Sequence, residues 1–262
     1  MEHTYWHTQT AASPLFPDIE WSRPEQKTQA GKLAIIGGNR LGFAAVGEAY
    51  EAAVQVGAGR VRAVLPEDLK RVIPAVITDT YFVPSNPSGG FSRQAVPELI
   101  AASAWADVCL LIGDNGRNSE TAIALETLLD NYNGHVVITR DTVDLLRSTG
   151  EKLVNRESTT LVLSFAQLQK LMASVYYPKI LSFSMQLMQL VEIVHKFTIT
   201  YPVALVTFHQ NQLIIAKDGQ VVTQEFDDPM LIWRGQTATR AACYLLWASG
   251  SPLKAITASV TL

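Results

Sequence analysis

Short apolar segments alternate with helix-like stretches through most of this chain, and that alternation is the feature that most constrains its fold. Buried strands are expected at residues 33–36, 61–65, 80–83, 108–112, 135–139, 160–163 and 204–208. The spacing of apolar and small residues predicts helices at 40–56, 66–73, 94–105, 119–131, 141–148, 165–173, 182–197 and 237–249. Strands that alternate with helices in this way form a mostly parallel sheet covered by helices on both faces.

Two further signals place the edge of the sheet and the end of the last expected helix. Asp218-Gly219 separates the apolar runs 212–216 and 220–223, which predicts an antiparallel hairpin that closes the edge of the sheet. Gly250, followed by Pro252, predicts the end of the last helix.

Length and composition favour one domain preceded by a short arm. A chain of 262 residues, 48% of them hydrophobic, can bury a large core in a single domain, expected here at residues 32–262. Residues 1–31 show neither helical nor strand periodicity and are expected to form an extended arm. The aromatic residues Trp6, Phe16 and Trp21 predict that this arm packs on its own domain or on a second subunit of a homo-oligomer.

Charge and hydropathy exclude several classes of partner. The formal net charge of −3 provides no basic surface for a nucleic acid backbone. The chain has no unbroken apolar run of the ~18 residues that a membrane span requires. Its first residues lack the basic start and apolar stretch of a signal peptide, so a cytoplasmic location is expected.

Cysteine and histidine usage gives no indication of a metal site. Cys109 and Cys243 lie inside apolar runs, where a thiol packs as a small hydrophobic group. His3 and His7 are four residues apart, but no cysteine or carboxylate cluster accompanies them. We therefore expect no metal bound by these residues.

Glycine occurs in three turns, of which two follow expected strands and one precedes an expected helix. They are Gly37-Gly38-Asn39, Gly113-Asp114-Asn115-Gly116, and Gly235 at the start of the last expected helix. In open parallel sheets, ligands bind beyond the carboxyl ends of the strands, where glycine lets the backbone approach phosphate. Each turn taken singly is also compatible with a simple tight turn.

Two residues near these turns have competing interpretations. Asp141 follows an expected strand and is either a metal or nucleotide contact or an ordinary helix N-cap. His209 ends another strand and is either a phosphate contact or a surface histidine.

The polar residues inside the turns are equally open to two interpretations. Asp114 and Asn115 suit a ribose or a magnesium-bound water, but both residue types also bond to the local backbone in turns. Arg234 is either an anion clamp beside Gly235 or the ion-pair partner of Asp227 or Asp228.

Several segments together resemble the ribokinase-like NAD(P)H-hydrate dehydratases. Lys32-Leu-Ala-Ile-Ile-Gly-Gly-Asn, Val56-Gly-Ala-Gly-Arg-Val and Ala106-Asp-Val-Cys-Leu-Leu-Ile-Gly are similar to that family's first strands and turns, and Leu213-Ile-Ile-Ala-Lys-Asp-Gly to its late hairpin. The resemblance spans about residues 32–250. It implies a three-layer α/β/α fold and a reaction that removes water from hydrated NADH or NADPH, coupled to hydrolysis of ATP or ADP, generally with magnesium.

The catalytic motifs of that family are altered in this sequence. The family's Gly-Thr-Gly-Asp turn, whose aspartate is the base, falls on Arg234-Gly235-Gln236-Thr237, and its Asp-Ala-Asp falls on Thr139-Arg140-Asp141. Its Thr-Pro-His-Pro-Gly-Glu loop falls near 162–167, and its lysine-glycine pair falls on His209-Gln210. A threonine hydroxyl at position 237 is not a base near neutral pH without another group to deprotonate it.

The sequence therefore predicts a divergent member of this family that binds a small-molecule nucleotide or a partner, with lost or much reduced catalysis. The alternatives are an active ATP- or ADP-dependent dehydratase acting on NAD(P)H hydrate and a small-molecule kinase. The residues expected to contact nucleotide or phosphate are Gly37, Gly38, Asn39, Gly113, Asp114, Asn115, Gly116, Asp141, His209, Arg234, Gly235 and Gln236, with Thr237 in the position of the catalytic aspartate.

Overall fold

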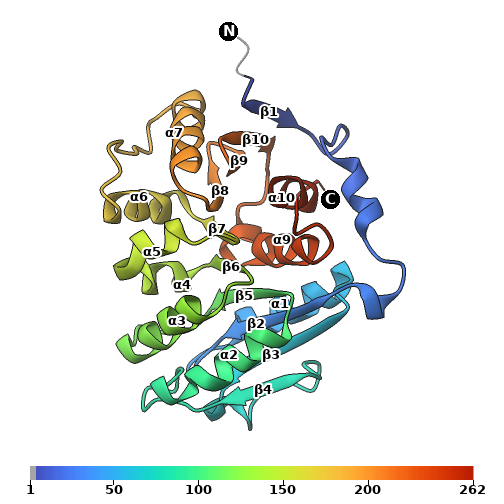
Figure 1. The fold of residues 1–262 in the computed structure, drawn as a ribbon, viewed down its shortest axis with the longest axis vertical. Coiled ribbons are helices and arrows are strands. Elements are labelled where there is room, and N and C mark those ends of the chain that lie inside the picture. The colour runs from blue at the N-terminus through green and yellow to red at the C-terminus, as the bar shows by residue number, and fades with distance from the viewer. Residues whose placement is uncertain (1–3, 262) are drawn as a thin grey trace.

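A ten-stranded sheet runs through the whole molecule in the computed structural model, which describes residues 4–261. The strand order is β1-β10-β9-β8-β7-β6-β5-β2-β3-β4 (Figure 1). The strands are β1 (Trp6–Gln9), β2 (Lys32–Gly37), β3 (Arg60–Pro66), β4 (Thr80–Val83), β5 (Val108–Gly113), β6 (His135–Thr139), β7 (Thr159–Leu163), β8 (Ala204–His209), β9 (Gln212–Lys217) and β10 (Gln220–Glu225). From β2 to β8 all neighbouring strands are parallel, and β9 is antiparallel to both β8 and β10.

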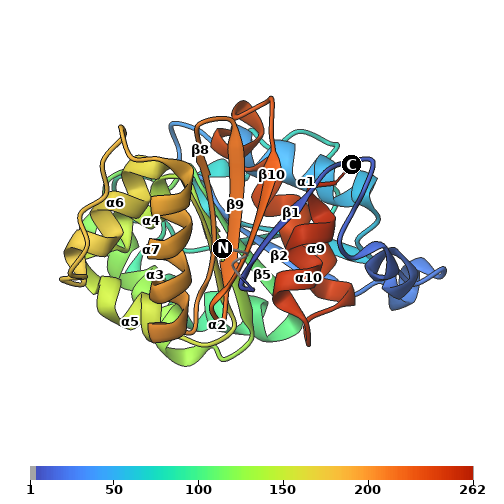
Figure 2. The same ribbon diagram turned by 90° about the horizontal axis from the view of Figure 1, so that it is seen from above.

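Helices cover both faces of this sheet. They are α1 (Ala44–Val56), α2 (Val96–Trp105), α3 (Ser119–Asn131), α4 (Asp141–Leu145), α5 (Gly150–Asn155), α6 (Phe165–Ser174), α7 (Leu187–Thr200), α8 (Met230–Trp233), α9 (Gln236–Trp247) and α10 (Pro252–Ser259). Successive strand residues point to opposite faces, so Leu33 and Ile35 belong to one buried cluster, whereas Ala34 and Ile36 belong to the other. The first cluster includes α1, α9 and α10, and the second includes α2, α3, α6 and α7 (Figure 2). The predicted three-layer α/β/α fold is confirmed.

Some predicted helices differ in extent from the observed ones. The stretch 66–73 forms only a short 3-10 helix, Glu67–Leu69, because Pro74 disfavours helical backbone in the residue before it. α7 begins at Leu187 rather than at 182, since the Ser182 hydroxyl accepts the Ser184 N–H at 3.3 Å in a local turn.

Three helices were not predicted from the sequence pattern. α5 follows α4 after a 3-10 turn, the four-residue α8 precedes Gly235, and α10 begins at Pro252. Proline has no N–H to lose at the first position of a helix, so Pro252 starts a helix instead of marking only the end of one. Gly235 consequently precedes the penultimate helix, not the last.

The hairpin at Asp218-Gly219 is confirmed, but it does not close the sheet. Both turn residues have positive φ, 50° for Asp218 and 74° for Gly219, as the tight hairpin turn requires. β1 pairs in parallel with β10 and is the true edge strand. The sequence prediction missed β1 because only Gln9 of its four residues is buried.

The segment before β2 packs against its own domain. The Trp6 indole N–H donates to Thr223 Oγ1 at 2.9 Å, and the buried Gln9 amide donates to Gln224 Oε1 at 2.7 Å. Phe16 packs on the cluster that includes α10. Trp21, in contrast, is 92% exposed and does not pack on its own domain, so for this residue contact with a second subunit stays a prediction.

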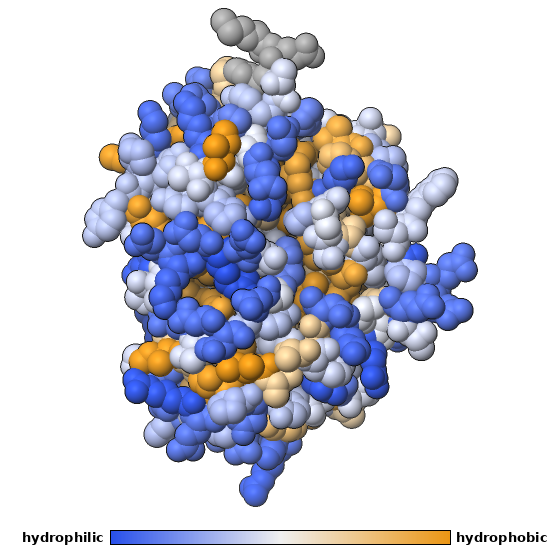
Figure 3. Space-filling model, in the orientation of Figure 1, coloured by the Kyte–Doolittle hydropathy of each residue, from blue (hydrophilic) through white to orange (hydrophobic). Residues whose placement is uncertain are grey.

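The surface in the view of Figure 3 is largely hydrophilic, with apolar side chains in patches between charged ones. Within residues 4–261, no helix has the length and apolarity to cross a bilayer.

Candidate functional site

Two adjoining cavities lie beyond the carboxyl ends of β5, β6 and β7, each with a volume of about 640 Å³. They share Asp141, Asp144 and Lys170, and we call them together the carboxyl-end groove. The first cavity is lined by polar side chains that include Asp114, Arg140, Asp141, Asp144, Gln167 and Lys170. Its apolar lining comes from Val162, Ala166, Ile232 and Trp233. The position matches the edge at which open parallel sheets bind ligands.

The first two glycine turns contact each other because β2 and β5 are neighbours. The Gly38 N–H donates to the Gly113 carbonyl at 2.8 Å, and the Asn39 side-chain amide donates to the Asp114 carbonyl at 2.7 Å. A Cβ on Gly37 would collide with the Gly113 carbonyl oxygen. Glycine at this position is therefore required by the close approach of the two strands.

Asp114 and Asn115 are engaged in bonds within the protein. Asp114 Oδ2 accepts the N–H of Ala45 in the first turn of α1 at 2.9 Å, and Oδ1 accepts from Arg140 Nη2 at 2.7 Å. The Asn115 amide donates to Thr142 Oγ1 at 2.7 Å. Asn115 Oδ1 is buried and makes no hydrogen bond to any residue from 4 to 261. The turn thus holds α1 and α4 in place.

Asp141 has a role that neither sequence interpretation described. It is the first residue of α4, and Arg140, not Asp141, is the N-cap. Its Oδ1 accepts the Asp114 N–H at 2.8 Å and its Oδ2 accepts the Asn115 N–H at 3.0 Å. Asp141 therefore fixes the conformation of the β5 turn.

Arg140 fills the space between two of the glycine turns. Besides its ion pair with Asp114, its Nη1 donates to the Trp233 carbonyl at 2.7 Å. A Cβ on Gly113 would lie 3.1 Å from Arg140 Cβ, and a Cβ on Gly235 would lie 3.3 Å from Arg140 Cδ. The Arg140 backbone has φ 56° and ψ −143°, a region that side-chain-bearing residues rarely adopt.

The sequence reasoning noted Arg140 only as a departure from an acidic motif. Its place directly after the buried strand β6 was a signal that could have marked it as a site residue.

The turn before α9 contains one glycine, and the N-terminus of α9 has no side-chain cap. Gly235, with φ 83°, is the N-cap of α9, and no side chain caps its free N–H groups. Thr237 is only 3% exposed. Gln236, in the same first turn, is half-buried. Arg234 is exposed and forms no ion pair with the described Asp227 or Asp228.

His209 does not line the groove. Its Nε2 is 2.9 Å from the Met185 carbonyl, so this nitrogen donates, and its ring stacks on Phe165 with centroids 4.6 Å apart. His209 holds the loop that precedes α7.

The carboxylates of the groove do not fit a magnesium site. Asp114 and Asp141 have both oxygens engaged, and Asp144 accepts from the Gln167 amide at 2.8 Å and lies 3.6 Å from Lys170 Nζ. Magnesium prefers free carboxylate oxygens and water in octahedral geometry. His3 lies outside the described residues. Over residues 4–261, no group of three or more histidine, cysteine, aspartate or glutamate side chains gathers in a way that could hold a metal ion.

Comparisons with known proteins agree with this fold. No family model matches the chain. The bifunctional NAD(P)H-hydrate repair enzyme Nnr of Moorella thermoacetica is 26% identical over 136 residues, which are 51% of this chain and 26% of that protein. The matched region thus spans about a quarter of the length of this relative.

Solved structures are similar over nearly the whole chain. A ribokinase-like superfamily protein of Enterococcus faecalis has a TM-score of 0.74 at 16% identity, covering 100% of this chain and 87% of that one. The ADP/ATP-dependent NAD(P)H-hydrate dehydratase of Bacillus subtilis, co-crystallized with ATP/Mg²⁺, has a TM-score of 0.63 at 13% identity, covering 92% and 84%. At these identities the structural likeness establishes the ribokinase-like fold.

Proposed function

We propose that this chain, a divergent relative of the ribokinase-like NAD(P)H-hydrate dehydratases, binds a small-molecule nucleotide in the carboxyl-end groove and does not catalyse the dehydration. The relationship rests on the sequence match to Nnr and on the shared fold. The fate of catalysis is inferred from the chemistry of the groove.

The absence of a usable general base carries the proposal. A base must turn a lone pair toward the proton that it removes, and a carboxylate that is held at both oxygens within the protein is not free to turn. Thr237, which is 3% exposed, offers only a hydroxyl in the position of the family's aspartate. Asp114 and Asp141, the carboxylates of the two nearby turns, each have both oxygens committed to hydrogen bonds or an ion pair. Neither of them replaces the missing base.

The position of Arg140 supports the same conclusion. Phosphoryl-group chemistry between Gly113 and Gly235 would require open space with converging backbone N–H donors. The Arg140 side chain occupies that space, and its guanidinium is held at both ends, by Asp114 and by the Trp233 carbonyl. A magnesium ion has no free carboxylate there, so we derive no step that involves one.

The first cavity nevertheless has the properties of a binding site. Its volume of about 640 Å³ lies within the range of ~300–1,000 Å³ that is typical of small-molecule pockets. Trp233 is 53% exposed and lines this cavity together with Val162 and Ile232. An exposed indole beside aliphatic side chains suits the face of a nucleotide base.

The test combines binding with turnover. Isothermal titration calorimetry with ADP and ATP is expected to give micromolar binding, and incubation with NADH hydrate and ATP is expected to regenerate no NADH above the buffer rate. Trp233→Ala should weaken ADP binding, because it removes the stacking surface. Trp21→Ala is the matched control, since its 92% exposed indole lies outside the groove. ATP-dependent regeneration of NADH by the purified protein would refute the loss of catalysis.

A further inference from the structure

The second cavity of the carboxyl-end groove carries an excess of positive charge. Arg117, Arg147 and Lys170 line it together with only two carboxylates, Asp141 and Asp144. The first cavity has the opposite balance, with two cations, Arg140 and Lys170, against three carboxylates. Of the two cavities, the second is therefore the one that attracts an anion.

The three cations of the second cavity come from three different elements. Arg117 lies in the turn between Gly116 and α3, Arg147 begins the 3-10 helix Arg147–Thr149, and Lys170 lies on α6. Convergence of basic side chains from separate elements on one concave surface is the arrangement that holds phosphate groups.

The two arginines are not paired within the protein. Both arginines are exposed. Across residues 4–261, neither Arg117 nor Arg147 makes a side-chain hydrogen bond or an ion pair. Their five N–H donors each are available to a ligand.

The two carboxylates of this cavity are already compensated. Asp141 accepts two backbone N–H groups, and Asp144 accepts the Gln167 amide and lies 3.6 Å from Lys170 Nζ. An incoming anion therefore meets two arginines that lack partners and carboxylates whose charge is partly offset.

We propose that Arg117, Arg147 and Lys170 form an anion subsite that binds the phosphate groups of the nucleotide, while its base lies in the first cavity against Trp233. The subsite rests on the proposed function, because it assigns the orientation of the nucleotide in that groove. The shared residues Asp141, Asp144 and Lys170 make the two cavities continuous. The Arg140 side chain lies between Gly113 and Gly235, so we place the phosphates in the second cavity instead.

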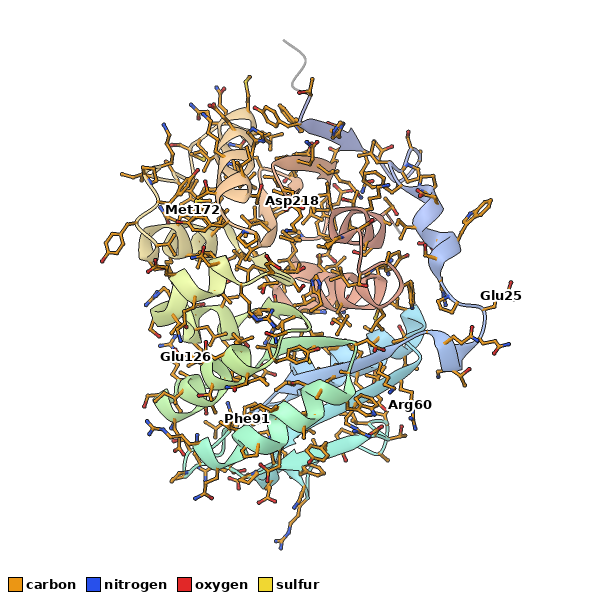
Figure 4. All side chains as sticks on the ribbon, in the orientation of Figure 1. Glu25, Arg60, Phe91, Glu126, Met172 and Asp218 are labelled. Carbon is orange, nitrogen blue, oxygen red and sulfur yellow. The ribbon has the colours of Figure 1, made fainter. Side chains whose placement is uncertain are left out.

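The experiment measures binding of adenosine, ADP and inorganic pyrophosphate by calorimetry in buffer with EDTA. For the double variant Arg117→Ala/Arg147→Ala we expect ADP and pyrophosphate to bind about tenfold more weakly, since each exposed ion pair contributes modestly. Adenosine binding is expected to be unchanged, because adenosine has no phosphate. The control is Arg60→Ala. Arg60 is an exposed arginine at the amino end of β3, whereas the groove lies beyond the carboxyl ends of the strands (Figure 4).

The outcomes separate the two proposals. Wild-type ADP affinity in the double variant would overturn the anion subsite and leave the proposed function standing. Arginine-dependent binding of pyrophosphate, without binding of adenosine or ADP, would overturn the proposed function and support the subsite. Binding of none of the three ligands by the wild-type protein would overturn both. An equal loss in Arg60→Ala would also count against the subsite, because it would indicate a general charge effect.

Discussion

Replacing Arg140 by alanine and by glycine separates the stabilisation from its side-chain bonds from the strain of its backbone. Both substitutions remove the ion pair with Asp114 and the hydrogen bond to the Trp233 carbonyl. The side chains of Arg140 and Asp114 are only 26% and 18% exposed, so solvent screens the pair incompletely. Losing these bonds should cost about 2–3 kcal/mol of unfolding free energy, because Asp114 keeps only its bond from Ala45.

The glycine variant should be the more stable of the two. At φ 56° and ψ −143°, alanine retains the backbone strain of arginine, whereas glycine adopts this conformation freely. We expect the unfolding free energy of Arg140→Gly to exceed that of Arg140→Ala by about 1 kcal/mol, after allowing for the greater chain entropy of unfolded glycine. This reverses the usual order of the two residues.

Urea unfolding followed by circular dichroism provides the measurement. The matched control is the pair Arg147→Ala and Arg147→Gly, because Arg147 lies in a 3-10 helix without positive φ and should show the usual order, with alanine more stable. Wild-type stability in Arg140→Ala would refute the assigned value of the ion pair. A glycine variant less stable than the alanine variant would refute the role of backbone strain.

Three further predictions concern ligand binding and stability. Replacing EDTA by magnesium should not strengthen ADP binding, since the groove carboxylates are engaged; a magnesium requirement in calorimetry would contradict this. Burial, followed by the charges of Arg156 and Lys217, lowers the pKa of His135 from 6.5 to about 4. The folded protein therefore binds this proton less readily than the unfolded chain, and stability should fall by up to about 3 kcal/mol between pH 6.5 and 4. His135→Gln should flatten that profile, and an unchanged profile would assign the loss to other groups. Arg156→Lys should cost about 2–4 kcal/mol in urea unfolding, because the guanidinium donates to the carbonyls of Tyr132 and Gly134 and a lysine cannot reproduce its fork; equal stability would contradict that role.

The sequence predicted the main strands and helices because their signal is local. β5 is six buried residues in a row, and the periodicity of the helix after it requires no knowledge of the rest of the chain. β1 lacked such a signal, because its pairing with β10 joins segments more than 200 residues apart and only one of its side chains is buried. Its strand conformation is set by the partner.

The site was predictable in location but not in its internal bonds. Adjacent parallel strands bring their carboxyl ends together, so the proximity of the Gly38 and Gly113 turns followed from strand order. The position of the Arg140 side chain did not, because it depends on a positive φ and on acceptors from the turn after β5 and from α8. The resemblance places Arg140 at the alanine of the family's Asp-Ala-Asp, which gives no indication that its side chain lies between Gly113 and Gly235.

The side chains of Asp114, Arg140 and Asp141 depend on each other physically. The partly buried Arg140 guanidinium needs an anion within reach, and Asp114 provides it at 2.7 Å. Asp114 is therefore held within the protein, and under the function proposed above an aspartate at position 237 would meet the Arg140 side chain in the space beside Gly235. Under that proposal, the position of the Arg140 side chain leaves Arg117 and Arg147, which lack partners within residues 4–261, as the donors of the groove that a phosphate would meet.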